Sequence, residues 1–207
     1  MKHLMSTSVK TAVDGDENPA ERHRQWVTRA KTGEEEAFRM LFEEFFPKIY
    51  GMIFHMVGQV ETAEDLAQST MVQAWRRLNQ FDGRSAFGTW LYRIGVNTAL
   101  DHLRRRKNRP MESLEVAAEA GIEPAVNPEP PGGALDDREL GAAIDRALQK
   151  LTPEHRAVFV LGEIEEMAYE DIGRVLKVKR GTVMSRMHYA RRHLQRLLRP
   201  FYERAQS

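Results

Sequence analysis

The sequence contains no cysteine, which excludes a disulfide framework, a cysteine-ligated metal site and a thiol nucleophile. It also lacks the His-Glu-x-x-His and Gly-x-Ser-x-Gly motifs and a phosphate-binding glycine loop, so we expect neither an enzyme nor a bound cofactor. No apolar run approaches the roughly 18 residues of a membrane span, and the first residues lack the apolar core of a signal peptide. These absences predict a cytoplasmic protein without a membrane span.

The charge is nearly balanced over the whole chain but unevenly distributed along it. The net charge of +1 combines −2 over residues 1–89, +5 over 90–109, −11 over 110–171 and +9 over 172–207. Two basic blocks separated by an acidic one are typical of proteins that bind nucleic acid. By itself, however, a charge run is as often a solvated surface.

The alternating pattern of a β-strand is also absent, whereas helical periodicity covers most of the chain. Gly33 and Gly58 predict helix ends, Pro47 predicts a bend or break, and Thr152 followed by Pro153 predicts a helix start. Helices are expected over about 21–31, 34–46, 48–58, 61–78, 87–107, 135–151, 153–163, 169–176 and 181–198.

These elements predict an all-α fold with two small helical domains joined by a flexible acidic linker rich in proline and glycine. The expected boundaries are a disordered tail over 1–19, a first domain over 20–109, the linker over 110–138, a second domain over 139–200 and a tail over 201–207. Within the linker we expect at most one helical turn, near residues 114–120.

The second domain carries the pattern of a helix-turn-helix, because two short helices are joined by residues 177–180. Gly173 in the first helix allows the two helices to approach closely. In the second helix one stripe is apolar and consists of Val183, Met187, Ala190, Leu194 and Leu197. The opposite stripe is polar and consists of Ser185, His188, Arg192, Arg196 and Arg199.

The segment from 172 to 200 holds nine Lys or Arg residues and no Asp or Glu. A helix with one buried edge and one basic edge suits the major groove of DNA. The alternative is a basic surface helix that only closes a three-helix bundle. His188 and His193 are five residues apart, which does not match the spacing of a two-histidine metal site.

In the first domain, Trp90, Asn97, Asp101 and Arg104 share one stripe of the helix expected over 87–107. An aromatic ring, an amide, a carboxylate and a guanidinium can together stack on and hydrogen-bond an unpaired base. The basic run 104–107 would add phosphate contacts. The alternative is that Trp90 belongs to the core and the basic run is a solvated helix end.

Several segments also match a known pattern in order along the chain. Residues 81–97 fit the signature F-x-G-x-S-x-F-x-T-W-L-Y-R-I-A-x-N, and residues 63–68 with 74–76 precede it as a second motif. Residues 151–156, and then 181–186 with 190–191, follow in the second domain. The chain thereby resembles the extracytoplasmic-function sigma factors of bacterial RNA polymerase, over about residues 35–109 and 140–198.

The resemblance implies an alternative sigma factor, a non-enzymatic protein that binds core RNA polymerase, directs it to specific promoters and promotes DNA melting in a stress response. The implied partners are the β′ clamp and β flap of core polymerase, promoter DNA and an anti-sigma factor.

The resemblance also implies roles for individual residues. Polymerase docking is assigned to Glu64, Asp65, Leu66, Gln68 and Trp75. Recognition and melting of the −10 element are assigned to Phe81, Gly83, Ser85, Phe87, Trp90, Arg93, Asn97, Asp101, Arg104 and Arg105. Recognition of the −35 element is assigned to Arg180, Thr182, Met184, Ser185, Arg186, His188, Tyr189 and Arg192.

The sequence departs from the family pattern at several of these places. Gly95 replaces a usual alanine, which costs roughly 1 kcal/mol in a helix interior. Ala168 stands where serine commonly caps a helix, and Lys177 holds a turn position usually occupied by glycine. Met184 and Tyr189 replace residues that are often basic, so the recognised promoter sequence is not predicted.

Two other functions remain open on the sequence alone. A stand-alone helix-turn-helix regulator is possible because residues 151–156 also resemble response-regulator output domains, but it leaves residues 35–109 unexplained. A helical hydrolase is the second alternative, and the missing catalytic motifs argue against it.

Overall fold

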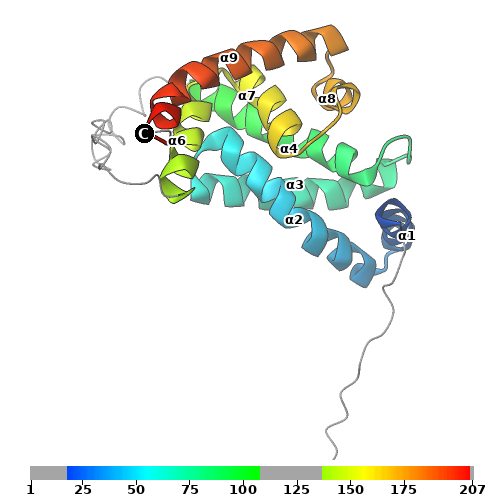
Figure 1. Ribbon diagram of the computed structural model, residues 1–207. Helices are drawn as coiled ribbons and strands as arrows, with labels where there is room; N and C mark the ends of the chain where they lie inside the picture. The colour runs from blue at the N-terminus through cyan, green and yellow to red at the C-terminus, as the bar shows by residue number, and fades with distance from the viewer. Residues whose placement is uncertain (1–17, 108–136, 206–207) are drawn as a thin grey trace, which may run out of the picture.

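The computed structural model describes residues 18–107 and 137–205, and every regular element in these two ranges is a helix (Figure 1). The predicted all-α fold is therefore confirmed. Residues 1–17 of the tail expected over 1–19, and residues 110–136 of the linker expected over 110–138 with its helical turn, lie outside the described residues. Pro19 and residues 137–138 are described and belong to helices. Across the described part of the chain, no helix is both long and apolar enough to cross a membrane.

The N-terminal half consists of α1 (Pro19–Lys31), α2 (Glu35–Val57), α3 (Val60–Arg77), the 3₁₀ turn η1 (Leu78–Gln80) and α4 (Phe87–Lys107). The side chain of Asn18 caps α1 by accepting a hydrogen bond from the backbone N–H of Ala20 at 3.0 Å. Gly33 and Gly58 have φ angles of 90° and 75°. Both glycines thus end helices in the left-handed conformation, as predicted.

The C-terminal half consists of α6 (Asp137–Gln149), α7 (Pro153–Phe159), the π-helical turn η2 (Val160–Ile164), α8 (Tyr169–Leu176) and α9 (Arg180–Ala205). Thr152 is the N-cap of α7, and its hydroxyl oxygen accepts a hydrogen bond from the backbone N–H of His155. Pro153 occupies the first helical position, where no backbone N–H is needed. This start was predicted from the sequence.

Two prolines do not end their helices. Pro47 lies inside a continuous α2, and Pro200 lies inside α9, which continues to Ala205. The prediction of a helix end near 198 and a tail from 201 is therefore wrong. Phe201 packs against the apolar cluster that contains Leu194 and Leu198, so continued burial of an apolar face offsets the lost backbone hydrogen bond.

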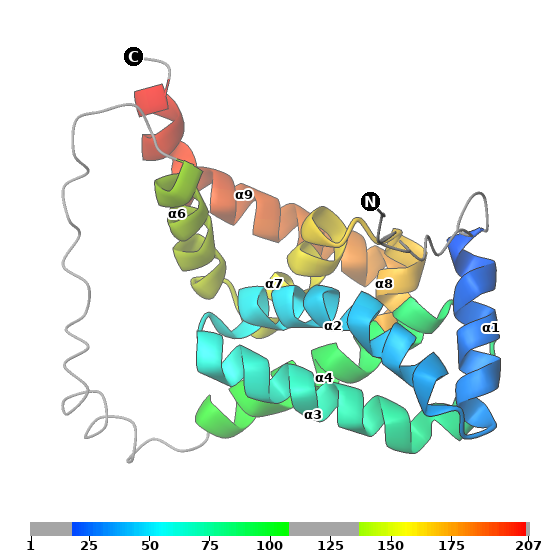
Figure 2. The ribbon, with the colours of Figure 1, turned by 90° about the horizontal axis from the view of Figure 1, so that it is seen from below.

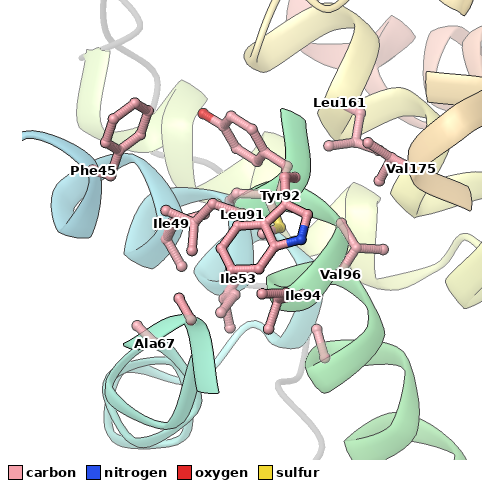
Figure 3. Packing of buried hydrophobic residues seen from close by; sticks show 14 of the residues in the cluster. Phe45, Ile49, Ile53, Ala67, Leu91, Tyr92, Ile94, Val96, Leu161 and Val175 are labelled. Carbon is pink, nitrogen blue, oxygen red and sulfur yellow. The ribbon is translucent and has the colours of Figure 1, made fainter. Parts of the chain in front are cut away.

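The two halves share a hydrophobic core. Helix α4 packs against α8 and α7, and α2 packs against α6 and η2 (Figure 2). Tyr92 and Val96 of the N-terminal half belong to the same buried cluster as Leu161 and Val175 of the C-terminal half (Figure 3). The sequence had predicted two domains on a tether, and the structure packs the two helical units directly against each other.

Polar contacts also join the halves. The hydroxyl of Tyr92 donates to the carboxylate of Glu165, and His55 Nδ1 lies 2.9 Å from Asp145 Oδ1. The buried guanidinium of Arg156 donates to the carbonyl oxygen of Met56, near the C-terminus of α2. Burial lowers the pKa of Arg156 to about 10, so the side chain remains charged at neutral pH.

Candidate nucleic-acid and partner interfaces

A groove of about 650 Å³ runs between α3 and α4. Five residues predicted to contact the −10 element line it: Trp90, Arg93, Asn97, Asp101 and Arg105. The sequence prediction missed its other lining residues, which are Leu66, Ser69, Gln73, Arg77, Gln80, Ile94, Thr98, His102 and Lys177. Lys177 comes from the turn between α8 and α9, so the C-terminal half contributes one wall of this groove.

The groove is positively charged. The side chains of Arg77, Arg93, Arg105 and Lys177 make no ion pair or hydrogen bond with any described residue. The single carboxylate of the lining, Asp101, already forms an ion pair with Arg104 at 3.0 Å. Unpaired cations around an exposed amide suit a ligand that carries both phosphates and hydrogen-bonding edges.

His102 adds no charge to this groove at neutral pH. Partial burial lowers the pKa of its imidazole, and the nearby charges of Arg106 and Arg105 lower it further. The ring is therefore an uncharged hydrogen-bonding group in the lining.

Trp90, which lines the groove, belongs to a cluster of aromatic rings. The rings of Phe81, Phe87 and Trp90 lie 5.4 to 5.7 Å apart between centroids, and Phe45 meets Phe87 at 5.3 Å. Trp90 is only 7% exposed, yet it lines the groove. The two interpretations of Trp90, core residue and site residue, are thus compatible, because one ring belongs to both.

The loop before α4 is held in place by local contacts. Gly83 has a φ of 74°, and the carboxylate of Asp82 accepts a hydrogen bond from the backbone N–H of Arg84 at 3.0 Å. The Lys31 side chain donates to the carbonyl oxygen of Phe81. Five residues predicted with the groove lie outside its lining: Phe81, Gly83, Ser85, Phe87 and Arg104.

A second groove, of about 580 Å³, lies between α2 and α3 and is mainly apolar. Trp75 is 41% exposed there and packs on Phe38 with a centroid distance of 4.5 Å. The other lining residues are Glu35, Phe42, Gln68, Met71 and Val72. An exposed apolar groove of this kind is typical of a protein-binding surface.

The predicted polymerase-docking residues do not all share this surface. Gln68 and Trp75 line the apolar groove, and Glu64 and Asp65 are exposed on the same helix. Leu66 lines the basic groove on the other side of α3. Phe38, Phe42 and Val72 were missed, although Phe38 and Phe42 are four residues apart and so share one helix face.

The turn between α8 and α9 has the geometry of a helix-turn-helix. A Cβ atom added at Gly173 would lie 2.9 Å from the carbonyl oxygen of Val178, which confirms that glycine permits the close approach. Lys177 is left-handed, with φ 54° and ψ 43°, as its glycine-like position predicts. Ala168 provides no side-chain cap for α8.

The face of α9 opposite the core is solvent-exposed. The stripe predicted from the sequence, Ser185, His188, Arg192, Arg196 and Arg199, is exposed throughout. On the buried side Val183, Met187, Ala190 and Leu194 pack inward, while Leu198 is buried more deeply than the predicted Leu197. The last buried position of the stripe is therefore Leu198, one residue after the predicted Leu197.

The remaining residues predicted for the −35 element surround this stripe. Arg180 forms an ion pair with Glu170 at 2.8 Å, and Thr182 is half-buried, with its carbonyl oxygen accepting from the Ser185 hydroxyl at 3.0 Å. Met184 and Tyr189 are about half exposed, and Arg186 is half-buried. The structure thus brings a basic, partly apolar surface together along the N-terminal part of α9.

Comparison with known families matches the two halves separately. Residues 41–109 match the family Sigma-70 region 2, and residues 141–194 match the family Sigma-70, region 4. The first match contains most of the lining of both grooves, without Glu35, Phe38 and Lys177, and the second contains the turn of the helix-turn-helix.

Similar proteins extend over most of the chain. The RNA polymerase sigma-H factor of Pseudomonas aeruginosa is 36% identical over 189 residues, which is 89% of this chain and 98% of that protein. The ECF RNA polymerase sigma factor SigW of Bacillus subtilis is 33% identical over 84% of this chain and 95% of that protein.

Among solved structures, CnrH in complex with the cytosolic domain of CnrY has a TM-score of 0.63 and 26% identity, and the match covers 86% of this chain and 98% of CnrH. The sigma factor RpoE of Bartonella quintana, in complex with the anti-sigma factor NepR, has a TM-score of 0.60 and 25% identity, over 78% of this chain and 96% of that one.

Proposed function

The chain belongs to the extracytoplasmic-function sigma factors of bacterial RNA polymerase, and we propose that its two basic surfaces recognise the two elements of a promoter. It is a sigma factor that binds core polymerase, directs it to specific promoters and promotes the melting of DNA for transcription initiation. The observation that carries the proposed residue roles is the groove between α3 and α4, in which unpaired cations surround Asn97 and the ring of Trp90 forms part of the lining.

In the groove, Asn97 would hydrogen-bond a base that has left the DNA stack, and Trp90 would support the pocket from below. Arg93 and Arg105 would neutralise the phosphates on either side. Melting then needs no hydrolysis, because binding of the unpaired strand offsets the loss of base stacking, a few kcal/mol for each flipped base. The loop 81–87 would shape the end of this pocket.

The apolar groove between α2 and α3 is the proposed docking surface for the β′ clamp. Trp75 supplies a large aromatic surface at its centre, and the exposed Glu64 and Asp65 supply charge at its edge. An aromatic anchor with a polar rim is the usual arrangement of a protein interface.

The exposed face of α9 is the proposed reader of the −35 duplex. Its partners are therefore core polymerase and promoter DNA, and an anti-sigma factor is a third partner, since the similar RpoE structure is a complex with one. We further propose the domain division that the sequence suggests, with residues 20–109 for polymerase and the −10 element and residues 139–200 for the −35 element.

A protein with this function works beside core polymerase and chromosomal DNA, and we place it in the cytoplasm for that reason. We also propose that it has no catalytic activity of its own, because its assigned surfaces bind macromolecules and none is assigned to chemistry.

The two grooves allow the proposal to be tested with a pair of variants. Asn97→Ala is expected to lower open-complex formation at least about tenfold, because it removes one or two good hydrogen bonds to a base. Binding to core polymerase should stay intact. Trp75→Ala is expected to do the reverse and weaken core binding. Affinity for core polymerase and permanganate footprinting of a melted promoter measure the two effects.

Equal loss of core binding and opening in Asn97→Ala would contradict the base-pocket role. Failure of the wild-type chain to bind core polymerase at all would instead favour a stand-alone helix-turn-helix regulator.

A further inference from the structure

Three aromatic side chains form a stack beside the exposed face of α9. The ring of Tyr189 lies 4.3 Å from the ring of His155, between centroids, and 5.9 Å from the ring of His193. The Tyr189 and His193 rings are nearly parallel, with an angle of 9° between their planes. His155 comes from α7, whereas the other two residues come from α9, so the stack extends the surface of α9 onto a neighbouring helix.

The hydrogen bonds of the two imidazoles occupy their Nδ1 atoms. His155 Nδ1 lies 2.6 Å from the hydroxyl oxygen of Thr152, which also accepts from the backbone N–H of His155. His193 Nδ1 accepts from a guanidinium nitrogen of Arg196 at 2.8 Å. Since guanidinium nitrogens only donate, the ring proton of His193 is on Nε2.

In His155, too, Nδ1 is the nitrogen held within the chain, by Thr152, and Nε2 is the nitrogen left to meet a ligand. Among the described residues, none accepts a hydrogen bond from either Nε2 atom. The stack therefore presents the Nε2–H of His193 and the unpaired Nε2 of His155 beside the phenolic hydroxyl of Tyr189, whose side chain is 50% exposed. An acceptor from outside the chain can bind the His193 N–H, and it can bind His155 once that ring is protonated.

The charges around His155 favour an anionic acceptor. Arg186 and His193 face it from α9, and Glu154 on its own helix is the one acidic group that acts on it. Partial burial lowers the pKa of His155, and Arg186 lowers it further, so the imidazole is neutral in the free protein at pH 7. An anion held against the ring has the opposite effect and favours the protonated form.

Tyr189 connects this stack to the exposed stripe of α9, because it lies four residues after Ser185 and three before Arg192. A DNA duplex laid along that stripe therefore brings its sugar-phosphate backbone to the edge at which the stack lies. We propose that His155, Tyr189 and His193 bind a backbone phosphate of that duplex, and that His155 takes up a proton when the phosphate binds. This inference rests on the proposed reading of duplex DNA by α9.

His155 is the member of the stack that can gain charge. In the protonated ring both nitrogens carry a proton, and the Thr152 hydroxyl can accept from Nδ1–H while it accepts from the backbone N–H. An N–H at His193 Nδ1 would point at the guanidinium of Arg196 and break that contact.

The test measures binding of the full chain to a fluorescent mixed-sequence DNA duplex, by anisotropy, from pH 8 to pH 6 at constant ionic strength. Uptake of one proton strengthens binding by at most about tenfold for each pH unit. His155→Phe keeps an aromatic ring in the stack and removes both the donor and the titration. His155→Gln keeps a neutral N–H donor and removes only the titration.

For His155→Phe we expect weaker binding than wild type by a factor that grows as the pH falls, and a salt dependence at pH 6 that is shallower by about one phosphate contact. For His155→Gln we expect binding close to wild type at pH 8, with a smaller gain at pH 6. Thermal unfolding of each variant establishes that it is folded at the temperature of the assay.

Identical pH profiles for wild type and His155→Phe would overturn the inference and leave the stack as a packing contact between α7 and α9. That result would leave the proposed function standing, because affinity for core polymerase and promoter melting are measured independently of it.

Discussion

Lys177 ends α8 in the left-handed conformation, which costs a residue with a Cβ atom roughly 1–2 kcal/mol. Its side chain also lines the basic groove between α3 and α4. One residue thus bears backbone strain at the turn of the helix-turn-helix and supplies a cation to a site on the other half of the chain. The usual glycine at this turn would avoid the strain but would remove the cation.

Lys177→Gly is expected to raise the free energy of unfolding by about 1 kcal/mol, because glycine adopts the left-handed conformation without a steric penalty. Urea denaturation followed by circular dichroism measures the change. Lys177→Ala is the matched control, since it removes the charge and retains the Cβ atom. If the alanine variant is stabilised as much as the glycine variant, the cause is charge repulsion and not the backbone.

At the scale of the elements, two glycines inside helices illustrate how packing decides the effect of a substitution. A Cβ atom at Gly173 would meet the carbonyl oxygen of Val178 at 2.9 Å, in the backbone of the turn. A Cβ atom at Gly95 would meet the terminal methyl group of Met52 at 2.8 Å. The first neighbour is fixed by the helix-turn-helix, whereas the second is the end of a flexible side chain.

Gly173→Ala is therefore expected to lower the free energy of unfolding by about 1–3 kcal/mol, because the turn must move. Gly95→Ala is expected to change it by less than about 1 kcal/mol, since the gain in helix propensity offsets the displacement of Met52. Parallel urea titrations of the two variants give the comparison. Equal losses would mean that the core around Met52 is as rigid as the turn.

At the scale of the whole molecule, the closed packing of the two halves conflicts with simultaneous promoter contacts. The −10 and −35 elements are named for positions 25 base pairs apart, roughly 85 Å along B-DNA. A compact chain of 207 residues has a radius of gyration of only about 17 Å. The halves must therefore separate when the protein engages both elements on polymerase.

The contact between Tyr92 and Glu165 makes this separation sensitive to pH. Burial raises the pKa of Glu165 above its usual range, opposed in part by the hydrogen bond from Tyr92 and by the nearby charges of His55 and Lys48. The packed state consequently binds a proton more tightly than the separated state. The stabilisation that protonated Glu165 gives to the packed state is fully present below about pH 4.5, and it is lost as the pH rises through the raised pKa of Glu165.

Förster transfer between dyes on the two halves measures their packing. Because the chain has no native cysteine, the dyes can be attached specifically at Glu61→Cys and Gln195→Cys, which are both exposed positions. We expect transfer to fall as the pH rises from 5 to 8. Glu165→Gln remains uncharged and can still accept from Tyr92, so its transfer should stay high. A Glu165→Gln profile that follows the wild type would show that Glu165 is not the group responsible for the pH dependence.

Sequence and structure agree best where the signal is local. The ends of α1 and α2 at Gly33 and Gly58, and the start of α7 at Thr152, were predicted because turn and cap chemistry involve neighbouring residues. The break allowed for at Pro47 does not occur, because buried residues before and after the proline hold α2 together as one helix. Leu66 was predicted together with Gln68 and Trp75, yet it lines the other groove, because neighbouring residues of a helix face different directions.

By itself, the sequence determined the all-α class, the helix-turn-helix with its basic exposed stripe, and the motifs of the sigma family. These depend on periodicity and on short-range spacing. Only the tertiary structure decided that the two halves share one core, that Lys177 completes a groove on α4, and that Trp90 belongs both to the core and to the groove lining. Such contacts join residues far apart in the chain, and their geometry depends on how whole helices pack, which no local pattern encodes.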